Sequence, residues 1–230
     1  MTGPRYVYAV CRPLDAPLQA QLTGVAGAPA KLLHHHGLVA VLSEVPERDF
    51  AEEPLRAHLM DDAWLAETAR AHRGVVDALT AVTTPLPLRL ATVLPDDSGV
   101  RSMIESGERT FLSTLDRIQG RVEWSVTASV AEDAPGDPWL EAERSATRLH
   151  ETLSSFAEDS RLHEPHGGDP SGRAARTVLD ASYLVPRGHS EEFVETLERV
   201  RADAPALRVE LAGPWAAYSF ARPATQEVWA

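Results

Sequence analysis

The stretch VEWSVTASV, residues 122–130, decides the kind of sheet this chain can build. Apolar residues occupy every second position from Val122 to Val130, and polar residues stand between them. Successive side chains of a strand point to opposite faces, so the pattern predicts a strand with one buried and one solvated face. Such strands are typical of antiparallel sheets.

The segments after this strand alternate between helix and strand patterns. Apolar steps of four and three predict a helix from Trp139 to about Phe156, and RTVLDASYLVP (176–186) predicts a strand. A helix capped by Ser190 and a strand in ALRVELAG (206–213) follow, and a short last strand is expected through Tyr218 to Phe220. This order favours an α+β sandwich related to the ferredoxin-like split βαβ.

The N-terminal half mixes strands and helices in a different order. We expect strands at Tyr6–Cys11 and Gly37–Val45, then a helix between Asp61 and Val82 that Asp61 caps. Pro87 and Pro95 bound the apolar run LRLATVL, and a further helix opens at residues 96–98 and stops at Gly120.

These patterns give two expected domains. Residues 1–120 form an N-terminal α+β domain, and residues 121–230 form a modified ferredoxin-like domain. The stretch HEPHGGDPSGR has almost nothing to bury, so a mobile loop is expected near residues 162–173.

Composition and charge narrow the classes of function. The chain has 230 residues and a formal net charge of -12, which argues against a nucleic-acid or anionic-membrane surface. The single cysteine, Cys11, lies in an apolar run and is expected to be a buried hydrophobe in a reducing compartment. No signal peptide or membrane span is expected, so we predict a soluble cytoplasmic protein.

Residues suited to catalysis or metal binding are present, but their spacing does not favour either. Neighbours on a strand point to opposite faces, so the triplet His34-His35-His36 is expected to be a polar turn between two strand halves rather than a metal site. His72 lies on an apolar helix face and is expected to be a core histidine with one hydrogen bond. Three of the four pairs of adjacent acidic residues fall at predicted helix starts. Carboxylates are favourable there because they complement the helix dipole, so these pairs do not require acid–base chemistry.

The motifs of nucleotide sites and hydrolases are missing from the sequence. It has no Walker loop, dinucleotide fingerprint or GxSxG elbow. We therefore expect no catalytic residue, no metal and no cofactor. The alternative is a small-ligand or metal-dependent enzyme on the ferredoxin-like fold, with His72 or the histidine triplet as its site.

Six segments, in this order, resemble the gas vesicle protein GvpL/GvpF family. They are YVYAV (6–10), the helix with Trp64-Leu65 and His72, LPLRLATVLPDD (86–97), VEWSV (122–126), ARTVLDASYLVPR (175–187) and ELAGPWAAYSF (210–220). The chain departs from the family in having Leu90-Ala91 where Phe-Gly is usual. It also has Ala212, Ala216 and Ala217 in place of a threonine and two prolines of the ending TGPWPPYSF.

The resemblance implies a non-enzymatic accessory protein of gas vesicles. Similar proteins are two-domain α+β molecules with a modified ferredoxin-like C-terminal domain. They are thought to associate with the hydrophobic shell protein GvpA and with other accessory Gvp proteins during early assembly. A shell subunit that assembles through apolar contacts needs a soluble partner beforehand.

The family motifs supply the candidate partner-binding or motif residues. Gly213 and Pro214 are expected to end a strand and reverse the chain, with Tyr218 and Phe220 returning on one face of the sheet. The aromatic residues are expected mainly to fill core, and Arg89 to hold a carboxylate or strand carbonyls. The full set is Arg89, Trp124, Gly213, Pro214, Trp215, Tyr218 and Phe220.

Overall fold

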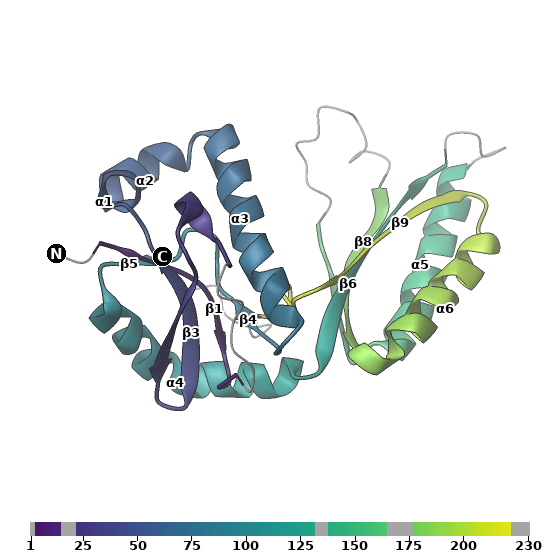
Figure 1. Cartoon of the computed structure of the whole chain (residues 1–230). Coiled ribbons are helices and arrows are strands. Elements are labelled where there is room, and N and C mark those ends of the chain that lie inside the picture. Colours follow the sequence, from purple (N-terminus) through teal and green to yellow (C-terminus); the bar gives the residue numbers. More distant parts are fainter. Residues whose placement is uncertain (1–2, 15–21, 132–137, 165–176, 222–230) are drawn as a thin grey trace. The chain divides into compact units, whose positions relative to one another are not determined.

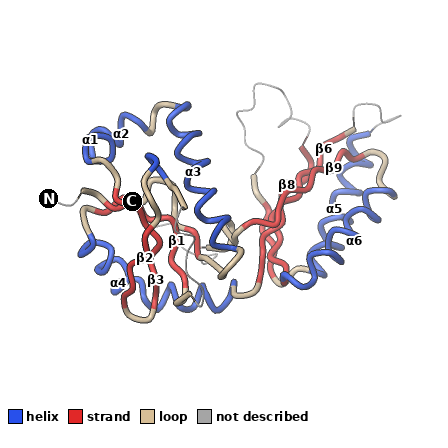
Figure 2. The backbone as a smooth tube through the Cα atoms, in the orientation of Figure 1, coloured by secondary structure: helices blue, strands red, loops and turns tan. Residues whose placement is uncertain are grey.

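A computed structural model describes residues 3–14, 22–131, 138–164 and 177–221, and contains two antiparallel sheets (Figures 1 and 2). The chain divides into two compact units, Met1–Gln119 with Ala216–Ala230, and Gly120–Trp215. The mixed α+β class predicted from the sequence is therefore confirmed. The boundaries 1–120 and 121–230 stay a prediction for independently folding domains. In the structure, the segment that begins at Ala216 groups with the first unit.

The first unit is built around one sheet with strand order β2-β3-β1-β4, and β5 also pairs with β1. Every residue of β1 is buried, because α3 and α4 both pack against this strand (Figure 1). The elements are β1 (Arg5–Cys11), η1 (Val25–Gly27), β2 (Lys31–His35), β3 (Leu38–Glu44), α1 (Glu47–Phe50), α2 (Glu52–His58), α3 (Asp62–Thr80), β4 (Leu86–Pro87), β5 (Val93–Leu94) and α4 (Asp97–Ile118).

An aspartate is the N-cap of each of the two long helices of this unit, α3 and α4. The side chain of Asp61 accepts hydrogen bonds from the backbone N–H groups of Ala63 and Trp64, as the sequence predicted. Asp96 does the same for Ser98 and Gly99. These caps satisfy N–H groups that have no partner within the helix.

Two further segments of this unit were not fully assigned from the sequence. A strand half before the histidine turn was expected, but its bounds were not: β2 has the pattern KLLHH, which is only partly apolar. The run between Pro87 and Pro95 is a turn between two short strands, because β4 ends at Pro87 and β5 begins at Val93. Ala91 in this turn has a φ of 60°, which a strand does not allow.

The second unit has a four-stranded sheet in the order β7-β8-β6-β9, with every neighbouring pair antiparallel. Helices α5 and α6 pack on the same face of this sheet (Figure 1), where they enclose the alternate apolar residues of β6. The elements are β6 (Arg121–Val130), α5 (Pro138–Phe156), β7 (Asp159–Leu162), β8 (Thr177–Pro186), η3 (Arg187–His189), α6 (Ser190–Ala202) and β9 (Leu207–Trp215).

The alternation in β6 is confirmed, but the predicted cap at Ser190 was wrong. The sequence reading missed β7, a short strand with only one large apolar residue. Helix α6 includes Ser190, and its N-cap is His189, which makes no side-chain capping bond. The predicted mobile loop overlaps the described chain only at residues 162–164, and the rest lies outside the described residues.

None of the helices in the described ranges combines the length and the apolar character that a membrane span requires.

Candidate functional site

Trp124 and Gly213 meet in the second unit. Trp124 is only 8% exposed, and its indole stacks on Phe193 with ring centroids 6.2 Å apart. Gly213 has a φ of +137°, and a Cβ built there would lie 2.9 Å from both Cε3 of Trp124 and the carbonyl oxygen of Glu123. The backbone therefore approaches the indole so closely that only glycine fits.

The strand continues through Gly213 and Pro214, contrary to the prediction that they end it. Strand β9 runs to Trp215, which pairs with Glu123 of β6 across a register shift. Pro214 is exposed and Trp215 is half-buried. Strands β6 and β9 stay paired up to Trp215 because the register shifts between Glu123 and Ser125, and this irregularity accommodates the bend of β9.

Tyr218 and Phe220 lie in turns and not in a last strand, so the expected shared face is absent. Phe220 is fully buried, whereas Tyr218 is 36% exposed. The carbonyl oxygen of Phe220 accepts a hydrogen bond from Nη2 of Arg117 at 2.5 Å. The segment that includes these residues groups with the first unit, so the GPW and YSF halves of the motif belong to different units.

The contacts expected of Arg89 are not found among the residues that the structure describes. Its side chain is exposed, and its guanidinium makes no ion pair or hydrogen bond with any residue that the structure describes. Its carbonyl oxygen instead accepts from the backbone N–H and the hydroxyl of Thr92. The PLR segment thus begins a turn, and within this turn the backbone N–H of Ala91 donates to the hydroxyl of Tyr6 at 3.0 Å.

His72 is a core histidine, as predicted, and does not line a site. It is 3% exposed, and its Nδ1 lies 3.1 Å from the hydroxyl of Tyr6. Burial lowers the pKa of His72 to about 4, so its ring is neutral at physiological pH. Cys11 is likewise fully buried, and burial raises the pKa of its thiol to about 12. Neither group is set up for nucleophilic or acid–base chemistry.

The histidine triplet forms a cluster that sequence reasoning missed. His35 pairs with Leu38, so His36 and Gly37 form a two-residue hairpin turn with φ values of 50° and 71°. His36 is therefore outside the strand, and the argument that neighbouring side chains diverge does not apply to it. The rings of His35 and His36 lie with centroids 4.4 Å apart, at an interplanar angle of 30°.

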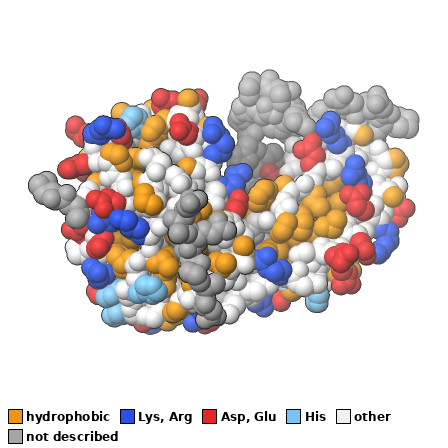
Figure 3. All heavy atoms as spheres, viewed as in Figure 1, with side chains coloured by type: hydrophobic (Ala, Val, Ile, Leu, Met, Phe, Trp, Pro, Cys, Tyr) orange, Lys and Arg blue, Asp and Glu red, His pale blue; other side chains and the backbone are white. Residues whose placement is uncertain are grey.

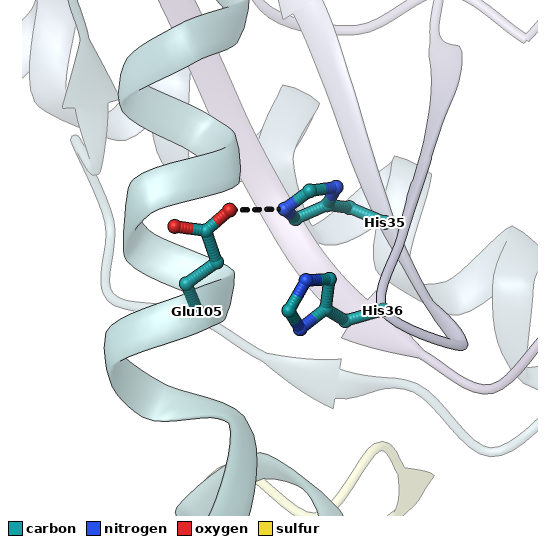
Figure 4. A group of neighbouring side chains, drawn as sticks. All are labelled: His35, His36 and Glu105. Carbon is teal, nitrogen blue, oxygen red and sulfur yellow. Dashed lines mark hydrogen bonds and ion pairs between the residues drawn. The ribbon is translucent and has the colours of Figure 1, made fainter.

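Helix α4 brings two carboxylates to these rings. Nε2 of His35 lies 2.7 Å from Oε1 of Glu105, and Nδ1 of His36 lies 2.9 Å from Oε2 of Glu108. Residues three apart share a helix face, which is why both carboxylates reach the hairpin. Figure 4 shows both rings on the side of the hairpin that faces the helix. The hydrogen bond to Glu108 raises the pKa of the exposed His36.

We define the His–Glu cluster as His35, His36, Glu105 and Glu108. One ligand atom from each of His35, His36 and Glu105 lies within 4.8 Å of the other two. Imidazole and carboxylate together are ligands for divalent transition metals. In the sequence, only the histidine triplet pointed to this cluster. Glu105 and Glu108 lie about seventy residues further along the chain, and no local pattern connects them with the histidines.

Solved structures with the same architecture are known. GvpF from Anabaena sp. PCC7120 matches with a TM-score of 0.74 over 99% of each chain, at 16% identity. GvpF from Microcystis aeruginosa matches with a TM-score of 0.73 over 96% of this chain and 100% of that one, also at 16% identity. The fold is thus that of a mixed α+β protein with two antiparallel sheets, of the kind seen in GvpF.

Sequence relatives extend this result to the family. The profile of the family described as "Gas vesicle synthesis protein GvpL/GvpF" matches residues 4–143 and 137–222. Gas vesicle protein L of Streptomyces sp. (strain CB03234) is 44% identical, over 97% of this chain and 95% of that protein. Gas vesicle protein F of the same strain is 25% identical, over 94% and 98%. The chain belongs to the GvpL/GvpF family of gas vesicle proteins.

Proposed function

We propose that this protein is a non-enzymatic accessory or minor structural protein of gas vesicles. It binds the shell protein GvpA and other accessory Gvp proteins, and it supports vesicle assembly in the cytoplasm. The observation that carries the proposal is the match to gas vesicle protein L, which is 44% identical over 97% of this chain. Both compact units are therefore included in the relationship.

The roles of the motif residues support a binding protein rather than an enzyme. Trp124, Gly213 and Phe220 fill core or allow close backbone contact, so the most recognisable parts of the sequence maintain the fold. His72 and Cys11 are buried away from solvent. This leaves the outer surface for recognition, which suits a protein that holds a partner.

The surface offers apolar side chains to such a partner in each unit. In the first unit, Met60 is 86% exposed at the turn between α2 and α3. In the second unit, Leu162 is 64% exposed at the end of β7. Figure 3 shows that apolar side chains are interspersed with both signs of charge on the visible face. Exposed apolar groups of this kind are candidates for contact with a hydrophobic shell subunit.

Two finer assignments belong to the same proposal. The chain is an L-type member, because its identity to protein L is 44% and its identity to protein F of the same strain is 25%. The second unit is a modified ferredoxin-like domain, since its elements run strand, helix, strand, strand, helix, strand around one antiparallel sheet.

Co-expression with GvpA tests the proposal. The full-length chain should be retained when GvpA is captured, and absence of retention while GvpA stays soluble would refute the binding function. Full-length variants are preferable to truncations near residue 120, because the segment from Ala216 groups with the first unit. Met60→Glu and Leu162→Glu are a matched pair at exposed positions, one in each unit. The variant that lowers retention identifies the unit that contacts GvpA.

Genetic complementation tests the L-type assignment. The gene should restore vesicles in a Streptomyces strain that lacks protein L, and it should not restore them in a strain that lacks protein F. The reverse pattern would contradict the assignment but would leave the family membership intact.

A further inference from the structure

We propose that the His–Glu cluster is a binding site for a divalent transition metal ion, with Zn²⁺ as the reference ion. The ion would bind at the tip of the β2–β3 hairpin and join it to helix α4. His35, His36 and Glu105 supply the protein ligands, and Glu108 orients the ring of His36. This site is separate from the proposed partner-binding function.

The backbone holds the two histidines in place. His35 is the last residue of β2, and His36 occupies the left-handed conformation that the tight turn requires. The hairpin is paired up to His35, so the backbone positions from which the two side chains extend are fixed. A rigid turn of this kind lowers the entropic cost of bringing two ligands to one ion.

The distances are close to those of a metal site. Zinc binds imidazole nitrogen and carboxylate oxygen at about 2.0–2.2 Å, which places two ligands of one ion about 3.3–3.6 Å apart in tetrahedral geometry. Here one ligand atom of each residue lies within 4.8 Å of the others, and the His35–Glu105 pair is 2.7 Å apart. Small rotations of side chains are enough to reach the required spacing. The Glu105 carboxylate is about half exposed, with 51% of its side-chain surface accessible, so it is free to make them.

The role of Glu108 follows from the nitrogen it engages. It contacts Nδ1 of His36, which leaves Nε2 of that ring available to the ion. Histidine ligands commonly donate their other ring N–H to a carboxylate, which sets the tautomer and the ring orientation. Glu108 therefore acts on His36 and is a positioning residue rather than a ligand.

The donor set selects the class of ion. Two imidazoles and one carboxylate suit Zn²⁺, Ni²⁺ or Cu²⁺, whereas Mg²⁺ and Ca²⁺ take oxygen ligands. Three protein ligands leave a fourth position for water, and the net charge of -12 favours any cation near the surface. Since the ligands come from a hairpin and a helix about seventy residues apart, a bound ion would stabilise the first unit against unfolding.

Zinc titration of the untagged, full-length protein after chelator treatment tests the site. We expect one Zn²⁺ per chain by calorimetry and a higher thermal midpoint of unfolding, with no effect of Mg²⁺ at the same concentration. His36→Asn removes the ring and keeps a residue that tolerates positive φ. Glu105→Gln removes the carboxylate. Each should weaken zinc binding about tenfold or more, and Glu108→Gln should weaken it less.

The matched control is His34→Asn. His34 precedes His35 on the strand, so its side chain is directed to the opposite face of β2. This variant should bind zinc as the wild type does. The proposal is overturned if zinc does not bind, if Mg²⁺ has the same effect, or if His34→Asn weakens binding as much as His36→Asn. If His36→Asn does not fold, Glu105→Gln decides, because its side chain is half exposed.

Discussion

The buried ring of His72 should make the stability of this protein depend on pH in a way that one substitution removes. Burial lowers the pKa of His72 from its ordinary value of 6.5 to about 4. Above pH 6.5 the ring is neutral in both the folded and the unfolded chain, so stability is unaffected. Between pH 6.5 and 4 the unfolded chain binds a proton that the folded chain does not. Stability therefore falls as pH falls through this window, and no further loss from His72 occurs below it.

The size of the effect follows from the shift. Each pKa unit corresponds to about 1.4 kcal/mol, so the full loss is about 3 kcal/mol and the loss by about pH 4.5 is about 2.5 kcal/mol. His72→Gln keeps a side chain that can accept the hydrogen bond from Tyr6 and does not titrate. The wild type should therefore lose about 2.5 kcal/mol more than the variant between about pH 7.5 and about pH 4.5.

Urea denaturation at these two pH values measures the loss of stability in the wild type and in the variant. The two values lie on either side of the sequence pI of about 5.2. Other groups titrate in both proteins, so the difference between the two losses isolates His72. NMR titration of the His72 ring in the folded protein should give a midpoint near pH 4. Equal pH dependence in the two proteins, or a ring that titrates near its ordinary value of 6.5, would show that the burial argument is wrong.

Three further predictions concern backbone and core, each measured by denaturant unfolding. Trp124→Ala should cost about 3–5 kcal/mol, because a large side chain leaves the core, and a cost below about 1 kcal/mol would contradict its placement there. Gly213→Ala should cost about 2 kcal/mol or more, since its Cβ would lie 2.9 Å from backbone and indole atoms; unchanged stability would rule out this close approach. Ala91→Gly should stabilise by about 0.5–1 kcal/mol, because Ala91 has a φ of 60°, and a loss of stability would argue against the left-handed turn.

The sequence determined those features that depend on neighbouring residues. The alternation of residues 122–130 identified β6 and its buried face, and Asp61 and the polar residues 96–98 marked the starts of α3 and α4. Periodicity and capping act within a few residues, so they can be read without knowing the rest of the fold.

Other features required the assembled structure. Strands β2 and β7 carry weak patterns, and they form because a neighbouring strand supplies hydrogen bonds that an isolated segment lacks. Strand β9 continues through Gly213 and Pro214 although local rules predict an end there, since its partner β6 accommodates the irregularity.

The His–Glu cluster shows most clearly which features follow from the sequence and which require the tertiary structure. The sequence presented three adjacent histidines, and strand geometry suggested that they diverge. The tertiary structure placed His36 in a turn and brought Glu105 and Glu108 of α4 to the rings. It also placed Phe220 with the first unit, although the strand just before it belongs to the second. Contacts between residues about seventy to one hundred positions apart depend on how whole elements pack, and no local pattern encodes them.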